Sequence, residues 1–214
     1  MEIPQNWTFE RQDIAKEFNR HVREQLPWYD LVSDAIIHFV RHYAPTGGVI
    51  YDIGCSTGNI GVRLADLIQE RGILYKPIES SQAMCNLYQG PGQVIRADAI
   101  TYEYRSFDVA ILFLVMMFFP IKKRERFLQT LINNINPGGA IIIVDKCLPF
   151  SGYLASVLWR LTLAGKLASG VTPNDILAKE LSLGGVQRPV DPSLFLAGKE
   201  WFHFGDFAGW IIEG

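Results

Sequence analysis

Apolar side chains recur along the chain at two spacings, and each spacing predicts one kind of element. In residues 9–25 apolar positions fall on every fourth residue, at Ile14, Phe18 and Val22, which is the spacing of one helix face. Residues 28–43 carry a second helical pattern, and a breaker rich in proline and glycine follows it. The sequence therefore predicts a helical cap over residues 1–44.

After this cap, short apolar runs alternate with amphipathic stretches. The apolar runs predict buried strands, and they cover residues 49–53, 73–78, 94–95, 107–114 and 140–144. The amphipathic stretches predict helices, and they cover residues 59–70, 81–88 and 122–135. Strands that alternate with helices in this way predict a parallel sheet covered by helices on both faces.

The last third of the chain has a different pattern. Residues 152–167 and 173–183 predict two more helices, the first of them strongly apolar, and residues 191–197 predict a short third one. We expect residues 150–198 to form a helical lid or insert. Two β-rich runs, 200–204 and 207–212, flank a Gly-Asp turn and predict a β-hairpin. The fold class expected is α/β, a Rossmann-like sheet closed by an antiparallel hairpin.

Composition and charge narrow the class of protein. The chain has 214 residues, 49% hydrophobic and 20% charged, which suits one globular domain with a sizeable core. A net charge of −2 argues against a protein that grips duplex nucleic acid by its phosphates. The three cysteines form no CxxC pair, so we expect reduced thiols, no metal site and a cytoplasmic protein. The most apolar stretch, 109–120, is too short to span a membrane.

The most informative segment is the turn after the first predicted strand. Gly54, Gly58 and Gly61 punctuate this turn, and a helical pattern follows. A strand, a glycine turn and a helix place backbone N–H groups beside a crevice, which suits a nucleoside-bearing cofactor. Ser56 stands where the dinucleotide pattern G-x-G-x-x-G needs glycine. With Asp52 just before it, the turn better suits a cofactor that has a positive centre and an amino-acid tail.

The C-terminal ends of three neighbouring predicted strands carry acidic residues, Asp52, Glu79 and Asp98. They fall on the sheet edge where open α/β sheets bind ligands. The Glu79 carboxylate can accept hydrogen bonds from both ribose hydroxyls, and Asp98 can accept from the amino group of adenine. Alone, Glu79 is equally explained as a helix cap and Asp98 as a turn residue. With the glycine turn, the acids predict a site for S-adenosylmethionine (SAM) or S-adenosylhomocysteine (SAH).

Several short motifs carry a family resemblance. They are Thr8-Phe9 with Phe18, Leu26-Pro-Trp-Tyr29, Tyr51-Asp-Ile-Gly-Cys-Ser56, Ser81-Gln-Ala-Met84, Asn136-Pro-Gly-Gly-Ala140, Asp145-Lys146 and Trp201-Phe-His-Phe204. Residues 45–214 resemble the class I SAM-dependent methyltransferases, and most closely the carboxy-SAM synthases that serve tRNA wobble-uridine modification. The resemblance implies a seven-stranded sheet whose last strand is antiparallel.

The resemblance also implies roles for individual residues. Glu79 would hold the ribose, Asp98 and Ala99 the adenine, and the turn from Gly54 to Gly58 the methionine end. The residues expected at the cofactor are Asp52, Gly54, Cys55, Ser56, Gly58, Glu79, Ser80, Asp98, Ala99 and Leu114. Tyr29 and Lys146 are the residues expected at the reacting groups, Tyr29 near the reactive end of the cofactor and Lys146 near a substrate carboxylate. Each has a plain alternative, packing for Tyr29 and solvation at a strand end for Lys146.

One departure from the family pattern bears on the cofactor. The synthases hold their extra carboxylate with an arginine on the helix before the final hairpin, whereas residues 191–198 contain none and the nearest is Arg188. This favours SAM over carboxy-SAM and predicts a methyltransferase with an unidentified small-molecule or tRNA-related acceptor. A carboxy-SAM synthase and a non-catalytic cofactor-binding partner protein are the alternatives. The apolar helix 152–167 favours a lid or a homodimer interface.

Overall fold

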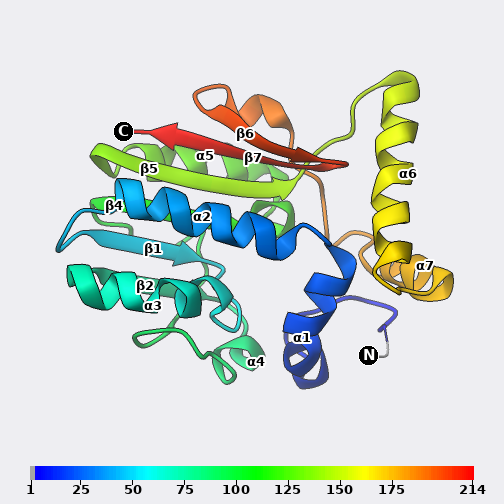
Figure 1. Ribbon diagram of the computed structural model, residues 1–214, viewed down its shortest axis with the longest axis horizontal. Helices are drawn as coiled ribbons and strands as arrows, with labels where there is room; N and C mark the ends of the chain where they lie inside the picture. The colour runs from blue at the N-terminus through cyan, green and yellow to red at the C-terminus, as the bar shows by residue number, and fades with distance from the viewer. Residues whose placement is uncertain (1–2) are drawn as a thin grey trace.

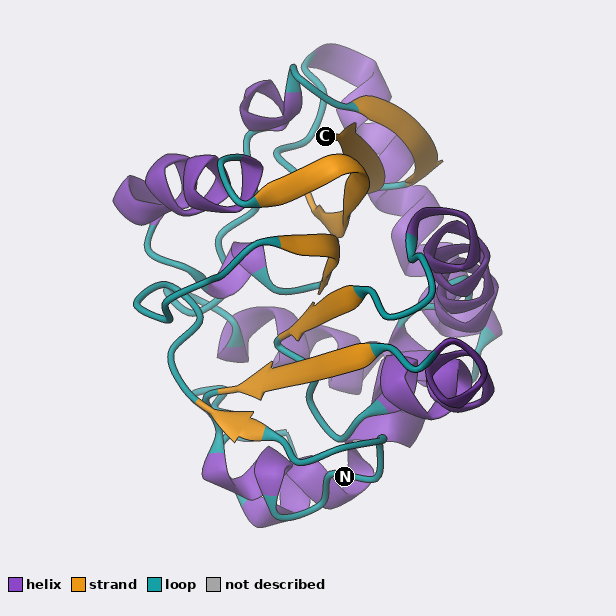
Figure 2. Cartoon of the chain, turned by 90° about the vertical axis from the view of Figure 1, so that its left-hand side faces the viewer, coloured by secondary structure: helices purple, strands orange, loops and turns teal. Residues whose placement is uncertain are grey.

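Seven strands form a single sheet in the order β3-β2-β1-β4-β5-β7-β6, with helices on both of its faces (Figures 1 and 2). This computed structural model describes residues 3–214, so the first two residues of the expected cap lie outside the described residues. β1 to β5 run parallel, and β7 pairs antiparallel with both β5 and β6. The predicted fold class is therefore confirmed.

The elements follow the predicted order along the chain. The strands are β1 Val49–Ile53, β2 Leu74–Glu79, β3 Ile95–Arg96, β4 Phe107–Phe113, β5 Ile135–Lys146, β6 Lys199–Phe204 and β7 Phe207–Glu213. The helices are α1 Gln12–Gln25, α2 Tyr29–Tyr43, α3 Asn59–Arg71, α4 Gln82–Cys85, α5 Ile121–Ile132, α6 Gly152–Ala168 and α7 Pro173–Ser182. Two 3₁₀ turns complete the set, η1 Met116–Phe118 and η2 Pro192–Phe195.

The central strands are largely apolar because both of their faces are buried. Successive side chains of a strand point to opposite faces, so Val109 and Ile111 of β4 pack toward α2 and α3. Ala110 and Leu112 of the same strand pack toward α5 and η2. The two hydrophobic cores thus lie on either side of the sheet, and the sheet edge formed by the strand ends remains available for a site.

Three of the differences from the predicted elements have a tertiary reason. α4 ends at Cys85 rather than residue 88, because Gln89 donates its backbone N–H to Thr57 (3.0 Å) and turns the chain back toward the glycine turn. β5 begins at Ile135 rather than residue 140, because Ile135 already pairs with Phe107 before the register shifts. The 3₁₀ turn η1 was not predicted. It follows Leu114, whose φ of 63° ends β4.

Helices α6 and α7 stand beside the carboxyl end of β5, next to α1 (Figure 1). Trp7 donates its backbone N–H to the carbonyl of Ser182 (3.0 Å), which joins the N-terminal segment to α7. α6 leaves large apolar side chains exposed, among them Tyr153 and Trp159. The homodimer predicted from this helix stays a prediction. Within residues 3–214, no helix is both long and apolar enough to cross a membrane.

Candidate functional site

A cavity of about 530 Å³ opens at the carboxyl ends of the parallel strands, under α1 and beside α6 and α7. Its volume lies in the range of small-molecule sites. The predicted site residues that line it are Tyr29, Asp52, Gly54, Cys55, Ser56, Glu79, Ser80, Asp98, Ala99, Leu114 and Lys146. The structure therefore brings all of the predicted site residues except Gly58 to one cavity.

Gly58 is not among the residues that line the cavity; it precedes α3 as the N-cap, in a left-handed conformation with a φ of 93°. A Cβ at this position would lie 2.5 Å from the backbone nitrogen of Gly90. The glycine therefore allows the turn to pass close to the loop after α4. This close approach is sufficient to explain why residue 58 is a glycine, and its contact with a cofactor stays a prediction.

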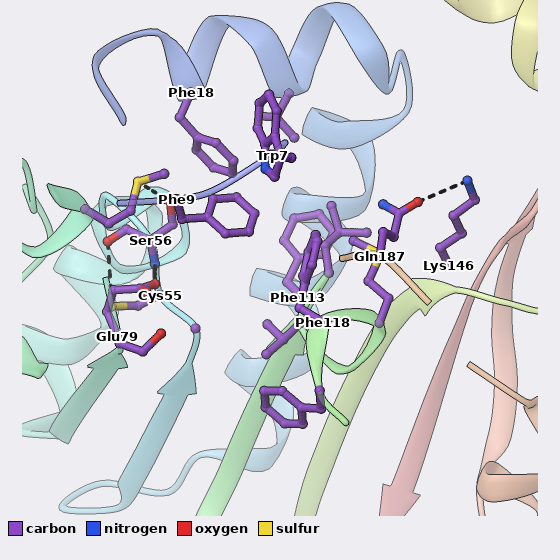
Figure 3. Close-up of a pocket in the computed structure, with 18 of the residues that line it drawn as sticks. Trp7, Phe9, Phe18, Cys55, Ser56, Glu79, Phe113, Phe118, Lys146 and Gln187 are labelled. Carbon is purple, nitrogen blue, oxygen red and sulfur yellow. Dashed lines mark hydrogen bonds between the residues drawn. The ribbon is translucent and has the colours of Figure 1, made fainter. Parts of the chain in front are cut away.

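The turn after β1 is fixed to β2 by backbone hydrogen bonds. Gly54 and Cys55 donate to the carbonyl of Ile78, at 2.8 and 3.0 Å. Ser56 has a φ of 53° and donates its N–H to Oε2 of Glu79 at 2.9 Å. The left-handed backbone at Ser56 directs this N–H toward the second strand, so the turn and the acid form one unit (Figure 3).

Glu79 is held at the end of β2 by two backbone donors. Ser56 donates to Oε2, and Ser81 donates to Oε1, each at 2.9 Å. Burial raises the pKa of Glu79 above its ordinary value, and these backbone N–H groups oppose that shift. Because each carboxylate oxygen has two lone pairs, Glu79 keeps acceptor capacity for ribose hydroxyls. Ser81 also caps α4 through its hydroxyl, which leaves Ser80 at the cavity.

The other two acids differ in their surroundings. Asp52 is almost fully buried and accepts a hydrogen bond from the Tyr75 hydroxyl. Burial raises the pKa of Asp52 to about 7. Asp98 lies at the exposed rim of the cavity, where its Oδ1 accepts from the backbone N–H of Ile100 at 2.9 Å. Its second oxygen has no such partner in the described chain, which suits contact with an amino group.

Aromatic side chains form much of the cavity wall, and several come from the cap (Figure 3). Phe9 makes edge contacts with Phe18 of α1 and with Phe118 of η1, at ring distances of 6.1 and 5.0 Å. Tyr29 stacks on Phe113 of β4 at 4.9 Å. Such a wall keeps water from the space next to the acids. Trp7, Phe9 and Phe18 were not among the residues predicted at the site, because they lie far from the glycine turn along the chain.

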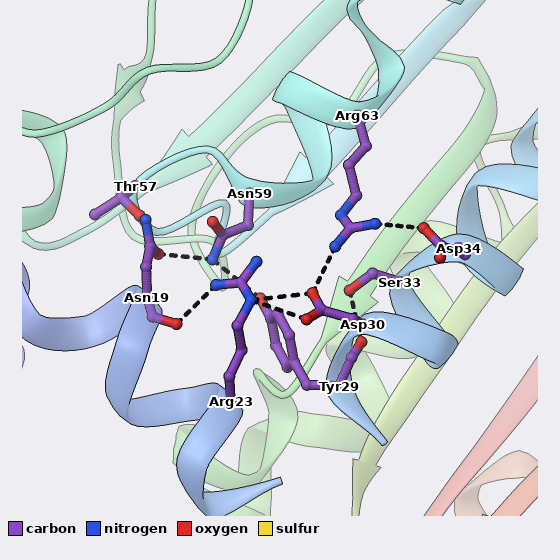
Figure 4. A network of polar contacts seen from close by, with 9 residues as sticks. All are labelled: Asn19, Arg23, Tyr29, Asp30, Ser33, Asp34, Thr57, Asn59 and Arg63. Atoms are coloured by element: carbon purple, nitrogen blue, oxygen red, sulfur yellow. Dashed lines mark hydrogen bonds and ion pairs between the residues drawn. The ribbon is translucent and has the colours of Figure 1, made fainter. Parts of the chain in front are cut away.

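Tyr29 is fixed by a polar network that joins the cap to the glycine turn (Figure 4). Asn59 at the start of α3 donates to the Tyr29 hydroxyl oxygen at 3.1 Å and to Oδ1 of Asn19 at 2.8 Å. The Thr57 hydroxyl donates to the same Asn19 oxygen at 2.8 Å. Burial raises the pKa of Tyr29 to about 12, so the phenol keeps its proton near neutral pH.

Lysine side chains gather at the other end of the cavity. Lys146 at the end of β5 donates to Oε1 of Gln187 at 3.2 Å (Figure 3). Lys166 of α6 forms an ion pair of 2.8 Å with Glu180 of α7. Lys179 of α7 is buried against the ring of Trp7. No local pattern in the sequence singles out Lys166 or Lys179, because lysines are ordinary residues of a solvated helix face.

No group of three or more histidine, cysteine, aspartate or glutamate side chains in residues 3–214 is placed to hold a metal ion. The donors that the cavity does offer are carboxylates beside a backbone turn at one end and amines at the other. A carboxylate held at the end of β2 and an acid at the end of β3 match the hydroxyl and amino groups of an adenosine. The residues present therefore fit a nucleoside cofactor.

Comparison with known proteins agrees with this geometry. Residues 51–143 match the family model described as a methyltransferase domain. The chain is 24% identical to a carboxy-S-adenosyl-L-methionine synthase of Staphylococcus epidermidis, with 97% of each chain covered. It is 27% identical to a protein of the same name from Shewanella halifaxensis, over 82% of this chain and 76% of the relative.

Solved structures show the same fold at low sequence identity. The plantazolicin methyltransferase BpumL in complex with SAH aligns with a TM-score of 0.61 at 13% identity, over 95% of this chain and 90% of BpumL. The magnesium protoporphyrin IX methyltransferase of Synechocystis with bound SAH aligns with a TM-score of 0.53 at 14% identity, over 89% of this chain and 86% of that one. These likenesses establish the class I methyltransferase fold.

Proposed function

Because this chain belongs to the SAM-dependent methyltransferases, we propose that it methylates a small acceptor molecule in the cavity, with SAM held at the acid-lined end. The observation that carries the proposal is the convergence of Asp52, Glu79 and Asp98 on one cavity, from the ends of three adjacent strands. Glu79 would hold the ribose, Asp98 the adenine and the turn 54–56 the methionine end.

In this mechanism the main task of the protein is to align the acceptor with SAM. Bound SAM supplies a methyl group that is already activated on a sulfonium sulfur. Tyr29, stacked on Phe113, forms a fixed wall of the reaction space, and its protonated phenol is a hydrogen-bond donor rather than a base. Phe9 and Phe118 exclude water from the same space. Holding the acceptor in line supplies much of the rate enhancement through proximity and orientation.

Calorimetric titration with SAH tests the cofactor site. We expect Glu79→Ala and Asp98→Ala to weaken SAH binding by about tenfold or more, since each loses a hydrogen bond from a buried ligand group to a charged acceptor. Glu70→Ala, which removes an exposed acid of α3, is the matched control and should bind as the wild type does. Absence of SAH and SAM binding by the wild-type protein would refute the proposal.

A second function is favoured by the curated relatives, which are named carboxy-SAM synthases and match most of the chain. Such an enzyme needs a cation for the added carboxylate. No arginine lines the cavity among the residues described, and Arg188 is exposed outside it, whereas Lys146 lines it. We therefore propose SAM as the cofactor, and keep carboxy-SAM as the alternative. The tRNA-related acceptor and the cytoplasmic location expected from the sequence stay predictions.

Mass spectrometry of the cofactor retained by the purified protein separates the two functions. Retained SAM or SAH supports a methyltransferase. Retained carboxy-SAM would establish the alternative, because its mass exceeds that of SAM by the added carboxylate. The Lys146→Met variant adds a second readout. If this variant loses the retained cofactor and the wild type keeps it, Lys146 contacts the added carboxylate of carboxy-SAM.

A further inference from the structure

The cavity is divided into two ends of opposite charge. The acids after β1, β2 and β3 lie at one end, and Lys146 and Gln187 lie at the other (Figure 3). Lys166 and Lys179 also line the lysine end. SAM accounts for the acids, but nothing in its proposed binding uses the lysines.

Three lysines, Lys146, Lys166 and Lys179, share two nearby carboxylates. Glu180 lies 2.8 Å from Nζ of Lys166 and 3.9 Å from Nζ of Lys146. The charges of Lys146 and Lys166 also act on Asp206. In the described part of the chain Lys179 has no ion-pair partner and packs on Trp7. Lys166 and Lys179 are both buried, with at most 8% of their surface exposed. Buried amines without matching carboxylates are costly, because a charge taken out of water needs a partner.

Two buried polar groups of α1 supply an independent observation at the same cavity. His21 Nε2 and Gln25 Oε1 have no hydrogen-bond partner within residues 3–214. Both residues are more than nine-tenths buried and both line the cavity. The His21 ring stacks on Trp7, the same ring that Lys179 contacts, so His21 belongs to the lysine end. Buried polar atoms are nearly always paired in folded proteins, so this pair points to a polar ligand.

We propose that the lysine end, formed by α1, α6, α7 and the end of β5, is a subsite for an anionic group of the acceptor, a carboxylate or a phosphate. This rests on the proposed function and deepens it, because it names the chemical class of the acceptor. Lys146 and Lys166 provide the charge, His21 donates to the anion through Nε2, and Gln25 Oε1 accepts from a hydroxyl of the same molecule. An acceptor anchored here extends along the cavity toward the glycine turn, where the methyl group would be.

The ionisation of Lys179 is consistent with this subsite. Burial, and next the charge of Lys166, lower the pKa of Lys179 to about 5, while Glu180 opposes the shift. The amine is therefore mostly neutral near pH 7. An anion placed beside it favours the charged form and reverses the shift.

Calorimetric titration of the SAH-saturated protein with a simple anion tests the proposal. The probes are inorganic phosphate and succinate, each at an ionic strength kept constant with sodium chloride. We expect binding of at least one anion, and a weakening of about tenfold or more in Lys166→Met and in Lys146→Met. Lys122→Met, which removes an exposed lysine at the start of α5, is the matched control and should bind like the wild type. Tighter binding of phosphate indicates a phosphate ester, and tighter binding of succinate indicates an organic acid.

A gain of binding keeps the test independent of folding defects. Glu180→Gln removes the carboxylate that occupies Lys146 and Lys166, so we expect anions to bind roughly threefold tighter or better. Damage to the fold would weaken anion binding and would not strengthen it. The proposal is overturned when neither anion binds the wild type, or when the lysine variants bind as the wild type does. SAH titration alone judges the methyltransferase proposal, so the two can fail separately.

Discussion

At the scale of single residues, the site depends on carboxyl groups whose ionisation is set by burial. Asp52 ends up inside the protein because β1 carries it to the cavity edge beneath the glycine turn, where Tyr75 donates to it. Glu79 is less isolated, since two backbone N–H groups hold it. The two acids therefore differ: Asp52 is a buried acid with a pKa of about 7, and Glu79 is held in place by backbone donors.

Asp52→Asn should change how stability depends on pH. The pKa of Asp52 is raised from 3.8 to about 7 in the folded protein, chiefly by burial, while Glu79 also raises it and Tyr75 opposes the shift. Between these values the folded state binds the proton and the unfolded state does not, so the stabilisation is complete below pH 3.8 and is lost as pH rises through 7. Asparagine has no such titration and can still accept from Tyr75.

We therefore expect Asp52→Asn to gain about 2 kcal/mol relative to the wild type between about pH 5 and pH 7. Urea unfolding at a series of pH values measures the free energy of unfolding for both proteins. Asp145, whose pKa is also raised by burial, is present in both and cancels in the difference. A difference that stays constant across this range would show that Asp52 ionises normally in the folded protein.

At the scale of elements, the loop after β4 is held by the end of the neighbouring strand. Asp145 of β5 accepts from the backbone N–H groups of Val115, Met116 and Met117, at 3.2, 2.7 and 3.3 Å. This carboxylate replaces the hydrogen bonds that the chain loses where Leu114 leaves the sheet in a left-handed conformation. The loop lines the cavity, so one buried acid of β5 shapes the site without facing it.

Asp145→Ala should destabilise the protein by about 3 kcal/mol or more, because it leaves buried backbone donors without acceptors. Asp145→Asn keeps one acceptor oxygen and should lose less. Urea unfolding measures both variants, with Asp66→Ala, an exposed acid of α3, as the control. We also expect SAH binding to weaken in Asp145→Ala, since the loop forms part of the cavity wall. Equal stability of Asp145→Ala and the control would show that the loop is held by other contacts.

At the scale of the whole molecule, the cavity lies between a sheet edge and a cap built from two distant parts of the chain. The N-terminal segment and α1 supply Trp7, Phe9 and Phe18, and α6 and α7 supply lysines. Trp7 connects the two parts through its hydrogen bond to Ser182 and its contact with Lys179. The cap and the sheet edge therefore share one site, and ligand binding should stabilise both.

Hydrogen exchange with and without SAH should reveal this coupling. We expect amides of α1 and α7 to exchange about tenfold more slowly or better when SAH is bound, because opening of the cap would then have to release the ligand. Amides at the C-terminal end of α5, around Leu128 and Leu131 on the opposite face of the sheet, provide the internal control. Protection limited to the glycine turn and the ends of β2 and β3 would show that the cap opens independently of the cofactor.

Much of the architecture follows from local pattern, and the exceptions have tertiary causes. Periodicity located the strands and nearly all helices, because the spacing of apolar residues along an element reflects whether one or both of its faces are buried. It missed the early start of β5 and the 3₁₀ turn η1, since pairing with Phe107 and capping by Asp145 depend on residues far away in sequence. Among the predicted site residues, Gly58 alone does not line the cavity; its close approach to Gly90 gives a tertiary reason for glycine there, and its cofactor contact stays a prediction.

The sequence by itself determined the sheet, the glycine turn and the acids that follow β1, β2 and β3, and thus the class of cofactor. These features are local, because a strand end and the turn after it lie together in the chain. Only the tertiary structure decided what faces the acids across the cavity. Lys146, Lys166 and Lys179 come from a strand and two helices, and only folding brings them to His21 and Gln25. The acceptor end of the site is therefore a property of packing between distant elements.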